Sequence, residues 1–308
     1  MHKLVYLCDW LPPDFGAVGQ YSLLFARERA ARGEDVVLAG LSSSADSIEE
    51  EEAHGSGRLR VVRLRRKSYD RADFRSRALW TAGTNFRLLW RLRRELRAAD
   101  EILFTGSPPF LIHFLVPANL LLGKRLTYRI TDFHPECLMA ELPRVPAWLR
   151  LFHRATVALR FRVHGFEVLG EDQRRRLREQ GIPEERIRLR RDPSPIEIPP
   201  GTEPLAAPSE LAGHVVLLYS GNFGVAHDDA TFVAGYLRHH REGTGRVALW
   251  LNSTGARADR VERELAAASL PFHRSRPVPL DRLARLLATP AAHLITLRDE
   301  FVGYVLPS

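Results

Sequence analysis

The sequence contains only two cysteines in 308 residues, Cys8 and Cys137, which lie far apart and form no C-x-x-C pair. This scarcity argues against a disulfide-stabilised domain and a structural zinc site, and it fits a reducing cytoplasm. The motifs H-E-x-x-H, D-x-D and G-x-x-x-x-G-K-[ST] do not occur either. Their absence argues against P-loop chemistry and against a nucleotide held through a metal ion. We therefore expect no metal and no cofactor.

Long apolar runs are also scarce. The start of the chain, Met1 to Trp10, carries one lysine and then enters a strand-like run, without the ordered regions of a signal peptide. The longest apolar stretch, Phe110 to Leu122, is interrupted by His113, Pro117 and Asn119 and is too short to span a bilayer. We therefore expect a cytoplasmic protein.

Positive charge is what the sequence has in excess. The formal net charge is +8, and arginines cluster at Arg58–Lys67, Arg71–Arg97 and Arg174–Arg191. Such a surface could bind nucleic acid, anionic lipid or a phosphorylated substrate. The alternative is that the protein simply uses arginine often, and that these arginines form a solvated face without a partner. The 45% hydrophobic and 27% charged fractions are those of a globular protein, and the length suggests two lobes.

The first part of the chain alternates short apolar segments with helical periodicity. This alternation predicts a parallel, doubly wound α/β sheet. The segment Leu59–Leu64 alternates as an exposed edge strand does, and Gly33 stands where a glycine ends a helix. We expect strands at 4–7, 36–39, 59–64, 101–104 and 125–130, a loop at 12–19, and helices at 21–32, 74–98 and 110–122.

A proline-rich stretch then divides the chain. We expect an N-terminal domain over 1–192, a linker over 193–212 and a C-terminal domain over 213–308. In the second domain the sequence pattern predicts strands at 215–219, 246–251 and 292–297, with helices at 228–241, 257–268 and 280–287. Three strands are fewer than a typical sheet has, so we expect this second lobe to be incomplete.

Two glycine turns, one opening each lobe, connect a strand to a helix. These are Gly16–Gly19 and Gly221–Gly224. Such a turn can aim backbone N–H groups and a helix N-terminus at an anion, and it can equally serve tight turning or close packing. Two of them facing each other across a cleft would favour phosphate binding.

Polar residues follow the strand at 125–130. Asp132, His134 and Glu136 lie at its carboxyl end, where open α/β sheets bind ligands. The alternative is that they cap the next helix after the turn at Pro135. Asp9 and Asp14 flank the first loop and could reach a substrate hydroxyl or serve loop hydrogen bonds.

Two tryptophans lie in the basic segment 74–98. Trp80 and Trp90 are either packing residues or, with the surrounding arginines, part of a membrane-binding surface.

Five segments resemble the GT-B glycosyltransferases of family 4, retaining enzymes that use nucleotide sugars to build bacterial surface polysaccharides and glycolipids. The resemblance lies in Pro12–Gly19, Ala30–Val36, Thr131–Glu136, Leu218–Asp228 and Val305–Ser308. It implies two Rossmann-like lobes, with the acceptor bound by the first and the donor by the second. The family's Arg/Lys pair on the donor phosphates is absent, and its donor-binding glutamate would lie beyond Ser308.

The resemblance also implies roles for particular residues. The acceptor would pass over Asp14, Gly16 and Gly19 toward Asp132, His134 and Glu136 as catalytic candidates. The donor diphosphate would lie against Gly221, Asn222, Phe223 and Gly224, with His227 as a partly charged partner and Arg298 on the leaving group. Transfer would be retaining, by a front-face route, and independent of metal.

The partners we expect are a nucleotide-sugar donor and a saccharide or lipid-linked acceptor. The basic first lobe could also lie on the anionic inner face of the cell membrane. Nucleic acid is not expected, since no helix-turn-helix, RRM or KH signature occurs. Three alternatives stay open: an epimerase of the same fold acting on nucleotide sugars, a basic lipid- or nucleic-acid-binding protein, and an inactive truncated relative.

Overall fold

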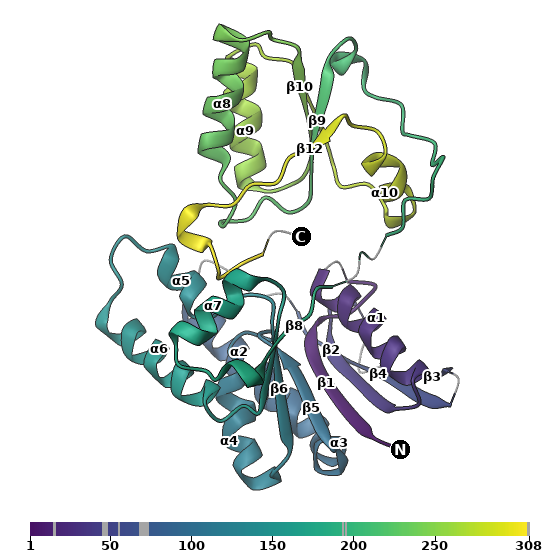
Figure 1. Cartoon of the computed structure of the whole chain (residues 1–308), viewed down its shortest axis with the longest axis vertical. Helices are drawn as coiled ribbons and strands as arrows, with labels where there is room; N and C mark the ends of the chain where they lie inside the picture. The colour runs from purple at the N-terminus through teal and green to yellow at the C-terminus, as the bar shows by residue number, and fades with distance from the viewer. Residues whose placement is uncertain are drawn as a thin grey trace. The chain divides into compact units, whose positions relative to one another are not determined.

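The computed structural model describes residues 1–14, 17–44, 49–54, 56–67, 74–192, 194 and 196–306. The chain divides into two compact units, each built on its own sheet (Figure 1). Unit 1 comprises Met1–Pro195 and the short segment Gly303–Leu306, and unit 2 comprises Ile196–Val302. The predicted class, two doubly wound α/β sheets, is confirmed.

Unit 1 contains an eight-stranded sheet in the order β3-β4-β2-β1-β5-β6-β7-β8. All neighbours pair in parallel except β3 and β4. The parallel strands point their carboxyl ends to one edge, as an open α/β sheet requires. The strands are β1 (Lys3–Trp10), β2 (Asp35–Ser42), β3 (Glu49–His54), β4 (Gly57–Arg65), β5 (Glu101–Thr105), β6 (Arg125–Ile130), β7 (Gly165–Val168) and β8 (Ile187–Leu189).

Helices cover both faces of this sheet because alternate strand residues point to opposite sides. Leu4 and Tyr6 of β1 pack with the helix α1, whereas Val5 and Leu7 pack with α2, α3 and α4. The helices of unit 1 are α1 (Ala17–Ala31), α2 (Phe74–Arg91), α3 (Arg93–Ala98), α4 (Ile112–Leu122), α5 (Glu136–Ala140), α6 (Ala147–Arg160) and α7 (Glu171–Glu179).

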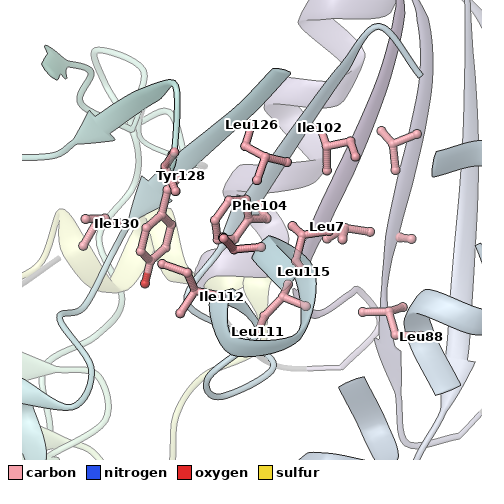
Figure 2. Close-up of a cluster of buried hydrophobic side chains, with 14 of the residues drawn as sticks. Leu7, Leu88, Ile102, Phe104, Leu111, Ile112, Leu115, Leu126, Tyr128 and Ile130 are labelled. Atoms are coloured by element: carbon pink, nitrogen blue, oxygen red, sulfur yellow. The ribbon is translucent and has the colours of Figure 1, made fainter. Parts of the chain in front are cut away.

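The larger core lies between the centre of the sheet and α4. Figure 2 shows Leu111, Ile112 and Leu115 beside the aromatic rings of β5 and β6. The rings of Phe104 and Tyr128 stack there, with centroids 4.6 Å apart. This packing fixes the carboxyl ends of β5 and β6, which carry the polar residues described below.

Several elements differ from the sequence expectation. The strand β4 is not at the edge, because β3 pairs outside it; β3 has the sequence EEEEAH, which lacks strand periodicity. The helix expected over 74–98 is split at Leu92. Helix α1 begins at Ala17, so Gly19 is helical rather than part of the loop. Gly33 does end α1 as predicted, with φ at 94°.

Unit 2 contains a parallel four-stranded sheet in the order β11-β10-β9-β12, one strand more than expected. Helices α8 and α9 cover one face and α10 the other. The segment 292–297 forms a strand only at its first two residues. The elements are β9 (Val215–Ser220), α8 (Asp229–Glu242), β10 (Val247–Asn252), α9 (Ala256–Ala267), β11 (Phe272–Ser275), α10 (Leu280–Leu287) and β12 (Ala292–His293).

No helix in the described ranges is long and apolar enough to cross a lipid bilayer.

Candidate functional site

Two carboxylates and an imidazole gather at the carboxyl edge of the unit 1 sheet. Asp9 belongs to the end of β1, and Asp132 and His134 follow β6. The hydroxyl of Ser107, just past β5, hydrogen-bonds to the Asp9 carboxylate. Three neighbouring strands thus deliver polar side chains to one place, as expected at this edge of an open α/β sheet.

Burial changes the acidity of both carboxyl groups. It raises the pKa of Asp132 above its usual value, an effect that the nearby His134 opposes and the charge of Asp9 reinforces. Burial likewise raises the pKa of Asp9, against the hydrogen bonds from Ser107 and the Trp10 backbone. A carboxylate whose pKa is raised attracts a proton more strongly. The pair is therefore suited to accept hydrogen bonds, or a proton, from a substrate hydroxyl.

Glu136 does not join this pair. Its carboxylate forms a bidentate ion pair with Arg160, whose side chain is fully buried, with 2.9 Å between Nη2 and Oε2. His153 and Gln180 also hydrogen-bond to it, at 3.1 and 3.0 Å. Burial would raise the pKa of Glu136, but these hydrogen bonds and the Arg160 charge hold it far below its usual value. Glu136 is therefore held as a carboxylate in a buried ion pair at neutral pH, and the catalytic role expected for it does not fit.

Arg160 also holds the backbone of His134. Arg160 Nη2 donates to the His134 carbonyl at 3.1 Å, and its guanidinium lies 5.0 Å from the centroid of the Phe133 ring. The segment Gly303–Leu306 fixes the same loop, because Phe133 N donates to Tyr304 O at 2.9 Å and Asp132 bridges to Val305. The Asp132–His134 loop is thus held on two sides.

Phe110 is a residue that the sequence did not single out. Its φ is 62°, a conformation that is costly for a residue with a side chain and that often occurs at functional sites. Its ring packs edge-on against His134, at 6.3 Å, and against Phe152, at 5.2 Å. It forms an apolar wall beside the imidazole.

The acceptor-side loop is only partly as expected. Gly16 lies outside the described residues. Asp14 accepts hydrogen bonds from the Ser43 amide, at 2.9 Å, and from the Ser43 hydroxyl. Burial opposes ionisation, yet these bonds hold the pKa of Asp14 below its usual value, so the loop-anchoring alternative describes it. At Gly19 a Cβ atom would lie 1.8 Å from the Trp10 carbonyl oxygen, so this glycine serves close packing.

In unit 2 the glycine turn follows β9 as predicted. Gly221 has φ at 147°, and its amide donates to Asn252 O at 3.2 Å. The Asn222 carbonyl accepts from the Gly224 amide, at 3.0 Å, and from the Tyr219 hydroxyl, also at 3.0 Å. The Phe223 ring is buried and stacks on Tyr219 at 4.4 Å. The Phe223 ring therefore packs the turn against β9, so any contact of Phe223 with a ligand would be through its backbone.

A row of polar side chains, which no sequence motif indicates, lies beside this turn. Ser220, Asn252 and Ser275 end β9, β10 and β11, and they are register partners. Ser220 Oγ donates to Asn252 Oδ1 at 3.1 Å, and Asn252 Nδ2 donates to Ser275 Oγ at 2.9 Å. Only a pairing of strands far apart in sequence brings them together.

His227 and Arg298 both lie next to the turn. The Nδ1 atom of His227 is 2.9 Å from the Thr296 carbonyl, and Arg298 Nη1 donates to Val225 O at 3.4 Å. Burial lowers the pKa of His227 below its usual value; the hydrogen bond with the Thr296 carbonyl opposes this shift and the charge of Arg257 adds to it. The shift disfavours the partial positive charge expected on His227. In the parts of the chain that the structure describes, no set of three or more acidic, His or Cys side chains is arranged to hold a metal ion.

No protein-family model and no curated protein matches the chain. Solved structures match its fold. HepE from Anabaena, in complex with UDP and glucose, has a TM-score of 0.57 at 11% identity, covering 95% of this chain and 73% of its own. The lipopolysaccharide outer core galactosyltransferase WaaB has a TM-score of 0.54 at 11% sequence identity, and the match covers 96% of this chain and 74% of WaaB. A UDP-forming trehalose-phosphate synthase from Burkholderia xenovorans, in complex with glucose-6-phosphate, has a TM-score of 0.65 at 14% sequence identity. That match covers 96% of this chain and 80% of the synthase. At these identities the match establishes the fold, which is the two-lobed GT-B fold.

Proposed function

We propose that this protein is a glycosyltransferase that moves a hexose from a nucleotide sugar to a saccharide or lipid-linked acceptor. The observation that carries the proposal is a GT-B fold with the Asp9–Asp132–His134 group at the carboxyl edge of unit 1. Proteins of similar structure were crystallised with UDP-glucose and UDP-2-fluoro glucose, which favours UDP as the nucleotide.

Unit 1 would bind the acceptor. A sugar hydroxyl becomes acidic as it attacks, so it needs an acceptor for its proton or a strengthening hydrogen bond. Asp132 and Asp9, whose pKa values burial raises, are suited to that role, and His134 lies near enough to influence both. The Phe110 ring beside His134 would keep water from this part of the site.

Unit 2 would bind the donor. Negative charge grows on the leaving diphosphate, so fixed hydrogen-bond donors near it supply much of the rate. Arg298 and the glycine turn would provide them, and the row Ser220–Asn252–Ser275 offers further polar contacts. His227, whose Nδ1 atom contacts the Thr296 carbonyl, would act as a hydrogen-bonding group through its other ring nitrogen.

The finer parts of the proposal rest on the motif resemblance. These are membership of family 4, surface-polysaccharide acceptors, retention of anomeric configuration, and transfer without a metal. The segments Thr131–Glu136 and Leu218–Asp228 support them, together with the absence of D-x-D.

The test is a thermal-shift panel with UDP, GDP, dTDP and CMP, each alone and as a nucleotide sugar. We expect a selective shift with one nucleotide that disappears in Gly221→Val, because a valine is strained at a φ of 147°. The matched control is Gly255→Val, which has the same open surroundings and a positive φ at the start of α9. A folded chain that shifts with none of these compounds would contradict the donor site.

A further inference from the structure

Helix α2 exposes a row of large apolar side chains. Leu79, Phe86 and Trp90 are 75%, 66% and 61% exposed, and their spacing of seven and four residues places them on one side of the helix. The opposite side buries Leu88 in the core, and Leu92 directly after the helix is buried there too. The exposed row, here called the α2 stripe, is therefore not needed for packing on the sheet.

The aromatic side chains of the α2 stripe contact one another and lie among arginines. The Phe86 and Trp90 rings stack at 6.2 Å, and the Arg93 guanidinium lies 4.9 Å from the centroid of the Trp90 ring. Arg87 and Arg94 are exposed nearby. The one acidic residue of α2 and α3, Glu95, pairs with Arg60 at 2.9 Å and so does not offset this charge.

Helix α6 repeats the pattern. Trp148 and Leu151, the α6 stripe, are 55% and 67% exposed and lie one turn apart. Arg150 and Arg154 are exposed on the same helix. Helix α4 contacts both α2 and α6 (Figure 1). It also ends in two exposed leucines, Leu120 and Leu121. Both stripes thus belong to the helical layer of unit 1 that α4 joins.

The composition of the two stripes identifies the partner. A polyanion such as nucleic acid is bound mainly through charge, which gives no reason for Leu79 and Leu151 to be exposed beside the arginines. A second copy that docked stripe to stripe would bring two arginine-bearing surfaces together, and their like charges repel. Aromatic and leucine side chains mixed with arginine suit the interface of an anionic bilayer, where rings enter the headgroup layer and guanidinium groups meet lipid phosphates.

We propose that the outer sides of α2 and α6 form a docking surface for an anionic lipid bilayer. The inference does not rest on the proposed enzymatic function. In this arrangement the protein would lie on the membrane surface, with α2 and α6 in contact with the lipid headgroups.

The test is co-sedimentation of the whole chain with vesicles of phosphatidylcholine, with and without phosphatidylglycerol. We expect binding only to the anionic vesicles. Phe86→Ser with Trp90→Ser should weaken it at least about tenfold, since two rings leave the interface. Arg87→Gln with Arg94→Gln should weaken it about fivefold per arginine. Leu151→Ser should weaken it as well.

Matched controls lie elsewhere on the surface. Leu24→Ser changes an exposed leucine of α1, on the other face of the sheet, and Arg238→Gln with Arg241→Gln removes two exposed arginines of α8. Both should bind as the unchanged chain does. Equal binding to neutral vesicles, or loss with the arginine changes but not the aromatic ones, would overturn the proposal. So would a dimer, seen by light scattering, that the Phe86 and Trp90 changes dissociate.

Discussion

Replacing Glu136 by glutamine is expected to lower the free energy of unfolding of unit 1 by about 3–5 kcal/mol, the cost of leaving a buried charge without its partner. Arg160 is 0% exposed, and its guanidinium bonds both oxygens of Glu136. Glutamine keeps the shape and one acceptor oxygen but removes the negative charge. The remaining acceptors of Arg160, Gln180 Oε1 and the His134 carbonyl, are neutral.

The pH dependence has a definite sign. The pKa of Glu136 is lower in the folded chain than its usual 4.5, so its contribution is complete above 4.5 and is lost as the pH falls below that value. Glu136→Gln should therefore be most destabilising at neutral pH. Its difference from the unchanged chain should shrink in acid.

The assay is a urea titration followed by hydrogen-exchange mass spectrometry on peptides from β6 and α6, because two units need not unfold together. The control is Glu171→Gln, which removes a partly exposed pair with Arg174 and should cost no more than about 0.5 kcal/mol. Changing Glu136 and Arg160 together to methionine should cost less than the two single changes summed. A loss below about 1 kcal/mol for Glu136→Gln, or strict additivity, would refute the reasoning.

Three other substitutions or titrations probe the packing and the two candidate sites. Gly19→Ala should destabilise unit 1 by about 2–3 kcal/mol in a urea titration, since its Cβ would lie 1.8 Å from the Trp10 carbonyl oxygen. The control is Gly235→Ala in α8, whose Cβ would meet no atom within 4 Å, so this change should be neutral or stabilising. Asp132→Asn should abolish sugar transfer yet raise stability at pH 7.5, because burial raises the Asp132 pKa and disfavours its charged form; a thermal melt showing the gain vanish toward pH 4 would agree with this sign. The His227 ring protons should titrate by NMR with a midpoint below 6.5, and a midpoint above it would contradict the downward shift that burial of this half-buried imidazole causes.

Periodicity made most of the fold predictable. The strand β6 and the helix α10 occur at the predicted residues, because buried or partly buried apolar side chains recur there at the spacing of their element. The strand β3 was missed because EEEEAH carries no such pattern and pairs only at the edge of the sheet. The division of the segment 74–98 at Leu92 has no glycine or proline to signal it.

The candidate site was less predictable because it depends on contacts between distant residues. Position after a strand was enough to select Asp132 and His134. The same position also selected Glu136, whose carboxylate pairs with Arg160, 24 residues further along the chain. Nothing local signals that pairing, the row from Ser220 to Ser275, or the left-handed backbone of Phe110. Gly19 shows the converse, since a glycine in a βα connection served packing rather than phosphate binding.

The most direct test of the central claim is transfer itself. The whole chain would be incubated with isotopically labelled UDP-glucose, the other nucleotide sugars and a mixture of saccharide and lipid-linked acceptors, with products followed by NMR and mass spectrometry. We predict that one nucleotide sugar gives a labelled glycoside that keeps the donor's anomeric configuration, and that Asp132→Asn gives none. Consumption of a donor without any acceptor would indicate an epimerase instead. A folded chain that turns over none of the donors would contradict the assignment as a glycosyltransferase.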